Sequence, residues 1–375
     1  MYVSTQAELA AFCERAASSK VLAVDTEFLR EKTYYPRLCL VQVAAGDDVA
    51  AVDPILIEDL SPLAALLADQ AVTKVVHACS QDLEVILDGM GCLCAPVFDT
   101  QLAAAFLGMR HQVSYGALVE AYCGVRLPKA ESLTDWSRRP LDPEQLAYAE
   151  DDVRYLPGIY DRMMAQLVEA DRLGWVLPEM EQLTRESHVR RDPRAAYLRL
   201  RRASSLTRRQ MAVAREVCEW RERTAARRDV PKKWVATDEV VVEVCKRTPS
   251  SPERLRRIRG TERLSDVEAR SLVDAVARGM VVAPQDCPEA ARRARPCVEE
   301  GVVDLMNAVL RLVSERSGVA SQLIATKDDL LEFAADRRRS ALGSGWRWEL
   351  AGRTLDRLLG GEVGLTVKGG RVELL

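Results

Sequence analysis

The sequence predicts an α/β domain with a mixed β-sheet, followed by two all-helical domains. Short apolar runs rich in β-branched residues alternate with helical segments at the start of the chain, whereas strand signals nearly vanish in its second part. Alternating strands and helices are typical of an α/β domain, and helical periodicity alone is typical of a helix bundle. A proline-containing stretch then divides the helical part in two. We therefore expect a first domain at 1–166, a helical linker at 167–205, a helical domain at 206–284, a linker at 285–298 and a second helical domain at 299–375.

Four short apolar runs predict the central strands of the first domain, at residues 21–24, 39–44, 49–53 and 74–77. Strands that are buried on both faces carry continuous runs of this kind. Leucines at helical spacing over residues 59–70 predict a helix between the last two strands. This order favours a sheet that is covered by helices.

Three further helices have start signals in the first domain. One is predicted to open at Ser80, directly after the fourth strand, and another covers 143–155 with Asp142 as its N-cap. Asp99 is expected to cap the third. At the other end of the chain, a pair of glycines predicts a small hairpin within residues 364–375.

The composition is that of a soluble globular protein. Of the 375 residues, 48% are hydrophobic and 29% are charged, and no run approaches the roughly 18 apolar residues that a membrane-spanning helix requires. The first residues lack the basic and apolar regions of a signal peptide, so we expect a cytoplasmic protein. The ten cysteines form no CxxC pair and the three histidines add no zinc spacing, so we expect free thiols.

Charge is unevenly distributed along the chain. Residues 1–165 carry 13 basic and 24 acidic side chains, whereas the remaining residues carry 40 and 32. An acidic first part beside a basic second part suits an enzyme whose acids hold metal and whose partner domain meets a polyanion. Two oppositely charged solvated surfaces would give the same counts, so the charge leaves both interpretations open.

Four acidic residues and one tyrosine stand at positions that favour a shared site. Asp25 and Glu27 lie two residues apart after an apolar strand run, so their side chains point to the same face. Asp82 lies at a strand-to-helix junction. Asp152 lies four residues after Tyr148 on a predicted helix, which places both on one face. Each pair alone has an ordinary explanation, as a loop start or as acids that favour a helix dipole, but their joint occurrence is more specific.

Phosphodiester hydrolysis requires such a set of residues. The reaction must place an attacking hydroxide in line and stabilise charge on the leaving oxygen, and two Mg²⁺ or Mn²⁺ ions about 4 Å apart do both. Hard cations of this kind bind oxygen ligands. Four clustered carboxylates would repel one another unless cations neutralise them, and a neighbouring tyrosine can orient the attacking water.

Three segments resemble the exonuclease motifs of the DEDD superfamily, tyrosine subtype. They are Val-Asp-Thr-Glu-Phe at 24–28, His-Ala-Cys-Ser-Gln-Asp-Leu at 77–83 and Tyr-Ala-Glu-Asp-Asp-Val at 148–153. The intervening Pro-Arg-Leu-Cys-Leu-Val-Gln-Val, Phe-Asp-Thr-Gln and Thr-Asp-Trp-Ser-Arg-Arg-Pro-Leu are similar to the bacterial ribonuclease D family in particular. The resemblance implies a ribonuclease H-like fold for the first domain and 3′→5′ exonuclease activity.

The resemblance also implies roles for the five residues. Two divalent ions, Mg²⁺ or Mn²⁺, would be held chiefly by Asp25, Glu27 and Asp152. Asp82 would complete the acidic set partly through water, and Tyr148 would orient the nucleophilic water.

Two neighbouring residues need separate interpretation. Asp151 lies three residues, not four, from Tyr148, so we assign it to the exposed helix surface. Ala78 stands where many family members carry asparagine after the motif histidine, and we take it as a tolerated variant.

Several residues around the acids are candidates for contact with the substrate. Phe28 follows the first two acids and would wedge against the terminal base or its sugar, although core packing explains it nearly as well. The segment 129–140 combines cations with an aromatic ring, which suits a grip on a strand end, although its tryptophan would equally pack inward. For Gln42 and His77, a buried structural role competes with substrate contact. The candidates are Phe28, Gln42, His77, Lys129, Trp136, Arg138 and Arg139.

The basic second half predicts a surface that tracks phosphates. Residues 206–280 carry many arginines and lysines with Trp220 and Trp234 among them, although glutamates on the same helices would balance an ordinary solvated surface. The pattern that begins with Glu-Trp-Arg at 219–221 and ends at Gly260 resembles an HRDC domain, a small helical bundle associated with nucleic-acid binding. Residues 299–375 resemble a second, divergent copy.

These expectations combine into one function. We expect a metal-dependent 3′→5′ exoribonuclease that releases nucleoside 5′-monophosphates and trims the 3′ ends of structured RNA precursors such as tRNA. RNA is the expected partner, without a membrane or a small-molecule cofactor, and the protein is expected to be a monomer. A DNA 3′→5′ exonuclease of repair type would share the same acids, and a catalytically silent RNA-binding scaffold would keep the helical domains alone. Both alternatives stay open.

Overall fold

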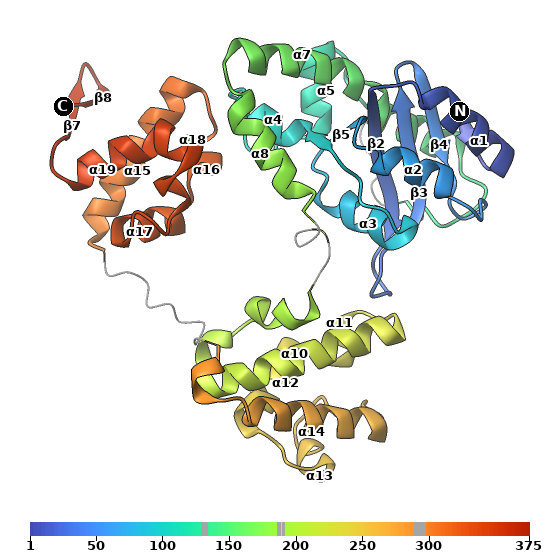
Figure 1. Ribbon diagram of the computed structural model, residues 1–375, viewed down its shortest axis with the longest axis vertical. Coiled ribbons are helices and arrows are strands. Elements are labelled where there is room, and N and C mark those ends of the chain that lie inside the picture. Colours follow the sequence, from blue (N-terminus) through green and yellow to red (C-terminus); the bar gives the residue numbers. More distant parts are fainter. Residues whose placement is uncertain (129–133, 186–188, 190–191, 289–297) are drawn as a thin grey trace. The chain divides into compact units, whose positions relative to one another are not determined.

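The computed structural model describes residues 1–128, 134–185, 189, 192–288 and 298–375 (Figure 1). The chain forms two compact units, and each is discontinuous in sequence. Unit 1 contains Met1–Glu27, Leu38–Arg185 and Arg295–Leu375. Unit 2 contains Phe28–Arg37 and Glu186–Ala294.

Unit 1 is built around a mixed six-stranded sheet with the order β1-β4-β3-β2-β5-β6. β2 pairs in parallel with β5 and β5 with β6, whereas β3 and β4 are antiparallel. The four predicted strands are confirmed, and each overlaps a strand of the sheet to within one residue at its carboxyl end or lies inside it. The strands are β1 (Tyr2–Val3), β2 (Val21–Leu29), β3 (Arg37–Ala45), β4 (Asp48–Val52), β5 (Thr73–Val76) and β6 (Val97–Asp99).

Helices alternate with these strands, as the sequence predicts for an α/β domain. The helices that were expected near residues 59–70, after Ser80 and over 143–155 are confirmed, and Asp99 caps a helix of its own. The helices are α1 (Gln6–Ala16), α2 (Ser61–Ala68), α3 (Ser80–Met90), α4 (Thr100–Phe106), α5 (Tyr115–Cys123), α6 (Pro143–Arg154), α7 (Leu156–Glu169) and α8 (Leu173–Leu183).

The core of unit 1 continues past the predicted end of the first domain. The boundary expected at residue 166 lies inside α7, and Val176 and Met180 of α8 are buried in the same hydrophobic cluster as Phe98 of β6. The first part of the predicted linker is therefore a core helix of unit 1. The other predicted domain boundaries stay predictions.

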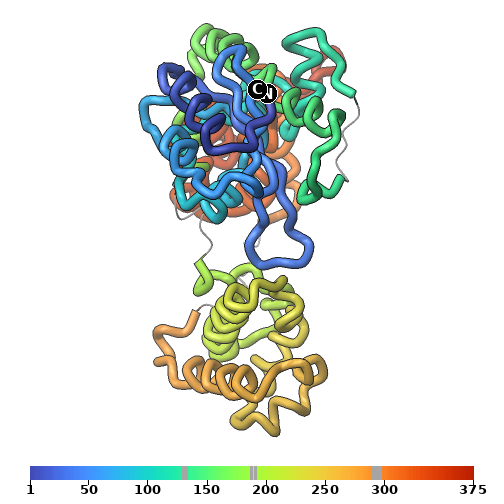
Figure 2. The backbone as a smooth tube through the Cα atoms, turned by 90° about the vertical axis from the view of Figure 1, so that its right-hand side faces the viewer, coloured from blue at the N-terminus to red at the C-terminus, as the bar shows by residue number. Residues whose placement is uncertain are grey.

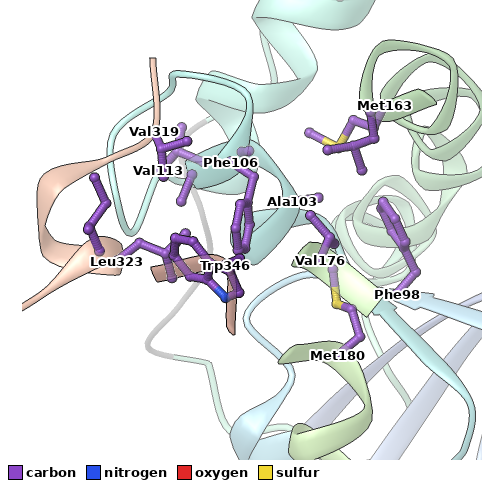
Figure 3. Close-up of a cluster of buried hydrophobic side chains, with 14 of the residues drawn as sticks. Phe98, Ala103, Phe106, Val113, Met163, Val176, Met180, Val319, Leu323 and Trp346 are labelled. Atoms are coloured by element: carbon purple, nitrogen blue, oxygen red, sulfur yellow. The ribbon is translucent and has the colours of Figure 1, made fainter. Parts of the chain in front are cut away.

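The C-terminal part of the chain packs against this core. Trp346 lies on Phe106 of α4, with 5.0 Å between the ring centroids (Figure 3). It also stacks on Trp175 of α8, with 5.9 Å between the centroids. The carboxylate of Glu179, also on α8, accepts hydrogen bonds from the Trp346 indole at 2.9 Å and from Arg347 at 2.5 Å. The predicted C-terminal hairpin is confirmed. The elements here are α15 (Glu300–Ser317), α16 (Ser321–Ile324), α17 (Lys327–Ala335), η4 (Ala341–Gly343), α18 (Gly345–Arg347), the π-helix η5 (Trp348–Gly352), α19 (Arg353–Leu359), β7 (Leu365–Lys368) and β8 (Arg371–Leu374).

Unit 2 is a small helical bundle, drawn in yellow to orange in Figure 2. The long helix α10 runs through it, and segment 28–37 packs on that helix, where the Tyr34 hydroxyl donates to Glu222 at 3.0 Å. The elements are η1 (Pro193–Arg199), η2 (Ala203–Ser205), α10 (Arg208–Arg228), α11 (Lys232–Val235), α12 (Asp238–Arg247), α13 (Pro252–Leu255), α14 (Asp266–Met280) and η3 (Pro284–Asp286).

Two composition-based expectations are met in the described part of the chain. Its nine described cysteines all carry free thiols. None of its helices combines the length and the apolar character needed to cross a membrane.

Candidate active site

β2 carries the first two acids of the candidate site. Asp25 and Glu27 are half-buried, whereas Thr26 between them is buried. This alternation follows from the period of two of a strand, which turns both carboxylates to the same face.

Helix α6 brings the third acid to the same place. Asp142 and Gln145 form a capping box that fixes the start of the helix, with the Asp142 amide donating to the Gln145 side chain at 2.8 Å. Ligand oxygens of Asp25, Glu27 and Asp152 all lie within 4.8 Å of one another. A group of this size and spacing can hold a cation between its carboxylates.

Asp82 stands next to this group in the first turn of α3. Its carboxylate accepts a hydrogen bond of 2.5 Å from the Thr26 hydroxyl, so the residue between the two strand acids fixes the fourth acid. Its charge also raises the pKa of Asp25 and of Glu27. Asp82 does not belong to the group of three acids whose ligand oxygens lie within 4.8 Å of one another. It therefore stands at the edge of the acidic set.

Burial raises the pKa of all four carboxyl groups, and repulsion from neighbouring acids adds to the effect. Desolvation is the largest cause for each, and it raises the pKa of Glu27 to about 8, of Asp152 to about 7 and of Asp82 to about 6. The pKa of Asp25 also lies well above its usual range, because the other three acids add their charges to the effect of burial. Within the described part of the chain, no lysine or arginine is among the groups that shift these pKa values.

The donor set therefore fits hard divalent cations. Carboxylate oxygens are the ligands that Mg²⁺ and Mn²⁺ prefer, and positive charge at this place would offset the repulsion that raises the pKa values. The described residues therefore supply a set of carboxylate ligands for such ions at this place.

Tyr148 is positioned against Asp152 on the same helix. Its phenol hydrogen-bonds to the Asp152 carboxylate, and this bond lowers the pKa of that acid while burial raises it. Burial, followed by the charge of Asp152, raises the pKa of the Tyr148 phenol above its usual range, so the phenol stays protonated at neutral pH. The ring of Trp136 lies 6.1 Å from the Tyr148 ring, centroid to centroid.

Asp151 lies apart from this cluster. Its carboxylate accepts a hydrogen bond of 3.1 Å from Arg154, one turn along the helix. Its backbone carbonyl accepts from the hydroxyl of Tyr115 at 2.8 Å, and Tyr115 was not among the expected residues.

His77 has both ring nitrogens occupied. One is hydrogen-bonded to the Thr100 hydroxyl at 2.9 Å and the other to the Val113 carbonyl at 3.1 Å. No ring nitrogen is left for a phosphate in this arrangement. These bonds favour a structural role for His77, and its contact with the substrate stays a prediction.

Asp99 organises the turn that follows His77. Its carboxylate accepts from the amides of Ala78 at 3.2 Å and Cys79 at 3.0 Å, and it also caps α4 through Gln101 and Leu102. Ala78 has a φ of 59°, in the left-handed region that a residue with a β-carbon adopts at a cost. Asp99 was expected only as a cap, and its hold on this turn has no local sequence signal.

Three of the expected substrate contacts are buried or bound within the protein. Gln42 is fully buried on β3, and Trp136 is only 4% exposed. Arg139 is bound to the buried carboxylate of Asp53. Burial or ion pairing favours a structural role for each of the three, and their contact with the substrate stays a prediction.

The other three candidates have different places. Phe28 is half-buried on β2 directly after Glu27, and Arg138 is exposed. Lys129 lies outside the described residues. Substrate contact by these three stays a prediction.

The chain matches two family models. A model described as 3′-5′ exonuclease covers residues 1–168, and a model described as HRDC domain covers residues 210–264. That residues 299–375 form a second, divergent HRDC-like domain stays a prediction.

Relatives match over nearly the whole chain. A ribonuclease D of Acidiphilium cryptum is 40% identical over 100% of this chain and 96% of its own length, and one of Nitrobacter hamburgensis is 39% identical over 99% and 98%. The crystal structure of Escherichia coli RNase D, described as an exoribonuclease involved in structured RNA processing, has a TM-score of 0.80 at 32% identity, covering 96% of this chain and 98% of that one. A Bifidobacterium adolescentis protein shares the fold, with a TM-score of 0.66 at 22% identity over 96% and 97%.

Proposed function

Because the chain belongs to the ribonuclease D family and is a 3′→5′ exoribonuclease, we propose that it hydrolyses RNA with the help of divalent metal ions and releases nucleoside 5′-monophosphates. The observation that supports the metal dependence is the approach of Asp25, Glu27 and Asp152 to within 4.8 Å of one another. We further propose that its substrates are the 3′ ends of structured RNA precursors such as tRNA. A cytoplasmic location and a monomeric state also stay predictions.

Asp25, Glu27 and Asp152 would hold the ions, and Asp82 would complete the set from beside Thr26. Two Mg²⁺ or Mn²⁺ ions supply a nucleophilic hydroxide at neutral pH and charge stabilisation on the leaving oxygen.

The remaining chemistry belongs to the protein. The terminal phosphodiester is hydrolysed when the oxygen of a water bonds to phosphorus and the bond from phosphorus to the 3′ oxygen breaks. The water's proton leaves it during attack, and the 3′ oxygen gains a proton as it departs. Tyr148 is neutral and held by Asp152, so its phenol can hydrogen-bond to the attacking water and aim it at the phosphorus.

Asp151 and Asp152 provide a matched pair of variants for testing the site. Asp152→Asn should abolish hydrolysis of a 3′-labelled oligonucleotide, because one ligand of the cluster is lost. RNA binding should be retained. Asp151→Asn, one residue away and bound to Arg154, should keep activity near wild type. Equal losses in the two variants would contradict the assigned metal site.

Tyr148→Phe tests the orientation of the water. A fall of roughly 10²-fold in kcat is expected, since a positioned hydrogen bond to the reacting group is removed. Binding of the RNA should change little, because the ring is kept. A wild-type kcat would remove the phenol from the mechanism.

Unit 2 offers a basic surface for the RNA. A hollow of about 420 Å³ is lined by five cationic side chains and two acidic ones, so its net charge is positive. Phosphate contacts made by such a surface weaken as salt rises, since counterions are released on binding. The cationic lining residues are Arg199, Arg201, Arg221, Lys232 and Lys233.

Substitution in this hollow is a sharper test than removal of the helical half. Deleting residues 206–375 would also remove Trp346, which covers Phe106 in the core of unit 1, so loss of affinity and loss of fold would be mixed. Arg199→Glu combined with Lys233→Glu should weaken RNA binding and flatten its salt dependence. Arg247→Gln, an exposed cation outside the hollow, is the control. Equal salt dependence in both proteins would exclude the hollow as the RNA surface.

Comparing RNA with DNA decides between the proposal and its alternatives. Side-by-side digestion of 3′-labelled single strands with Mn²⁺ should consume RNA faster. Faster loss of DNA would indicate a DNA exonuclease, and intact strands of both kinds would indicate a silent scaffold.

A further inference from the structure

The guanidinium group of Arg139 uses all five of its N–H donors inside the protein. Nε and Nη2 bind the two carboxylate oxygens of Asp53, the second at 2.8 Å. Nη2 also donates to the carbonyl of Cys39 at 2.7 Å, and Nη1 donates to the carbonyls of Trp136 and Arg138, both at 2.8 Å. Five donors in a planar fork are the full capacity of an arginine, so this side chain acts as a fixed junction.

The other half of the junction is anchored in the sheet. Asp53 follows β4 directly, its side chain is fully buried, and it also accepts from the amide of Ile55 at 2.9 Å and from the hydroxyl of Tyr2 on β1. Cys39 lies on β3. The pair thereby ties the segment before α6 to three strands of unit 1.

The segment that Arg139 holds carries Trp136 to the candidate site. The Trp136 carbonyl is bound by Arg139, and its ring is buried against Tyr148 with 6.1 Å between centroids and 35° between the planes. Tyr148 in turn contacts Asp152. A continuous set of contacts thus leads from a buried ion pair to the phenol.

We propose that Arg139 and Asp53 are positioning residues for the reaction, because together they hold Trp136 against Tyr148 and so fix the phenol beside Asp152. This inference rests on the proposed role of Tyr148. Both side chains are bonded within the protein, so neither is expected to touch the reacting atoms. Their effect on catalysis comes from the placement of the ring, and displacement of a reacting group by about 1 Å can cost on the order of 10²-fold in rate.

The geometry requires an arginine at this position. A lysine keeps the charge but has three donors in place of five, so it cannot bind Asp53 in a bidentate manner and hold three carbonyls as well. Arg139→Lys should therefore fold, keep KM within about twofold and lose roughly ten-fold or more in kcat. A surface ion pair at the other end of β4 is the control: Arg15→Gln breaks the exposed bond to Asp48, and its kcat should equal that of wild type.

A double-mutant cycle separates positioning from a merely structural role. kcat and KM on a short 3′-labelled RNA are measured for wild type, Arg139→Lys, Tyr148→Phe and the double variant, with thermal unfolding of each. If Arg139 acts through the phenol, its substitution should cost little further kcat once the hydroxyl is absent. A wild-type kcat in folded Arg139→Lys, or full additivity of the two losses, would overturn the inference.

Two further results keep the test decisive. Trp136→Phe keeps a buried ring but alters its contact with Tyr148, so it should also lower kcat in a manner that is not additive with Tyr148→Phe. If every Arg139 variant fails to fold, this variant decides, and a folded Trp136→Phe with wild-type kcat refutes the inference. A wild-type kcat in Tyr148→Phe alone would instead refute the proposed role of the phenol, which is a separate failure.

Discussion

At the scale of single residues, the four acids lie where ionisation of their carboxyl groups is unfavourable without cations. Burial raises the pKa of each, and for Asp25 and Glu27 the charges of neighbouring acids add to it. Ionising the whole set in the folded protein therefore costs free energy that the unfolded chain does not spend. The binding site is prepared at the expense of stability of the metal-free protein.

This cost predicts how stability depends on pH. Between about pH 4 and pH 8 the folded protein binds protons at Glu27 and Asp152 that the unfolded chain releases, so the free energy of unfolding should fall as pH rises. The window follows from pKa values of about 8 and about 7 in the folded state. Thermal unfolding in EDTA across this range measures it. Mn²⁺ should remove much of the fall, because it binds the ionised acids of the folded state.

A variant supplies the control for this pH dependence. Asp152→Asn removes one of the titrating groups, so its unfolding temperature in EDTA should fall less steeply with pH than that of wild type. A stability that rises with pH in wild type, or equal slopes in both proteins, would contradict the assignment.

Ala78 predicts a gain in stability. A residue with a β-carbon in the left-handed region costs about 1 kcal/mol or more, and glycine or asparagine is accommodated there more easily. Ala78→Asn should raise the free energy of unfolding by about 1 kcal/mol, measured by urea denaturation. Ala121→Gly, within α5, should instead lower it by about 0.5–1 kcal/mol. A loss of stability in Ala78→Asn would mean that the turn does not accept the larger side chain.

At the scale of elements, the sequence predicted the features that depend on local patterns. The four central strands have apolar runs, and α6 has its N-cap at Asp142, so both were expected and found. The strand period placed Asp25 with Glu27, and the helical spacing placed Tyr148 with Asp152. β1 and β6 were not expected, because two or three residues are too few to show a period.

Features that depend on tertiary contacts could not be predicted. Trp136 and Arg139 have the residue types that bind a nucleic-acid end. Only the ion pair with the buried carboxylate of Asp53 shows that Arg139 is bound within the protein. Asp53 was expected merely as the end of a strand. The hold of Asp99 on the turn at Ala78 joins residues that are about 20 apart in sequence, so no local pattern reports it.

Asp99 gives a prediction at this scale. Asp99→Ala removes the cap of α4 and leaves the amides of Ala78 and Cys79 without their partner, which should lower the free energy of unfolding by about 3 kcal/mol. Urea denaturation measures the loss. Asp59→Ala, at an exposed position where the carboxylate accepts from Ser61, should cost less than about 1 kcal/mol. A similar small loss at both positions would contradict the central role of Asp99.

At the scale of the whole molecule, unit 1 joins parts of the chain that are far apart in sequence. Glu179 and Trp175 of α8 meet Arg347 and Trp346, and the Ala320 amide donates to the carbonyl of Ala105 at 2.9 Å. These contacts make the C-terminal helices part of the same core as the sheet that carries the acids. Their role is therefore at least partly structural.

Trp346 tests this joint core. Trp346→Ala should lower the stability of unit 1 by about 3–5 kcal/mol, since a large buried ring is removed. Trp234→Ala in unit 2, where the ring is 49% exposed, should change stability little. Urea denaturation measures both. Equal effects would mean that the C-terminal helices are not integral to the core.

The return of the chain to unit 1 after residue 294 has a consequence for synthesis on the ribosome. All four acids and Tyr148 emerge before the helices of unit 2, whereas the helix that carries Trp346 onto Phe106 emerges after them. A translation product that stops within unit 2 would carry every residue of the candidate site and still lack the cover of its core. Formation of the complete nuclease core therefore waits until the segment that follows unit 2 has been synthesised.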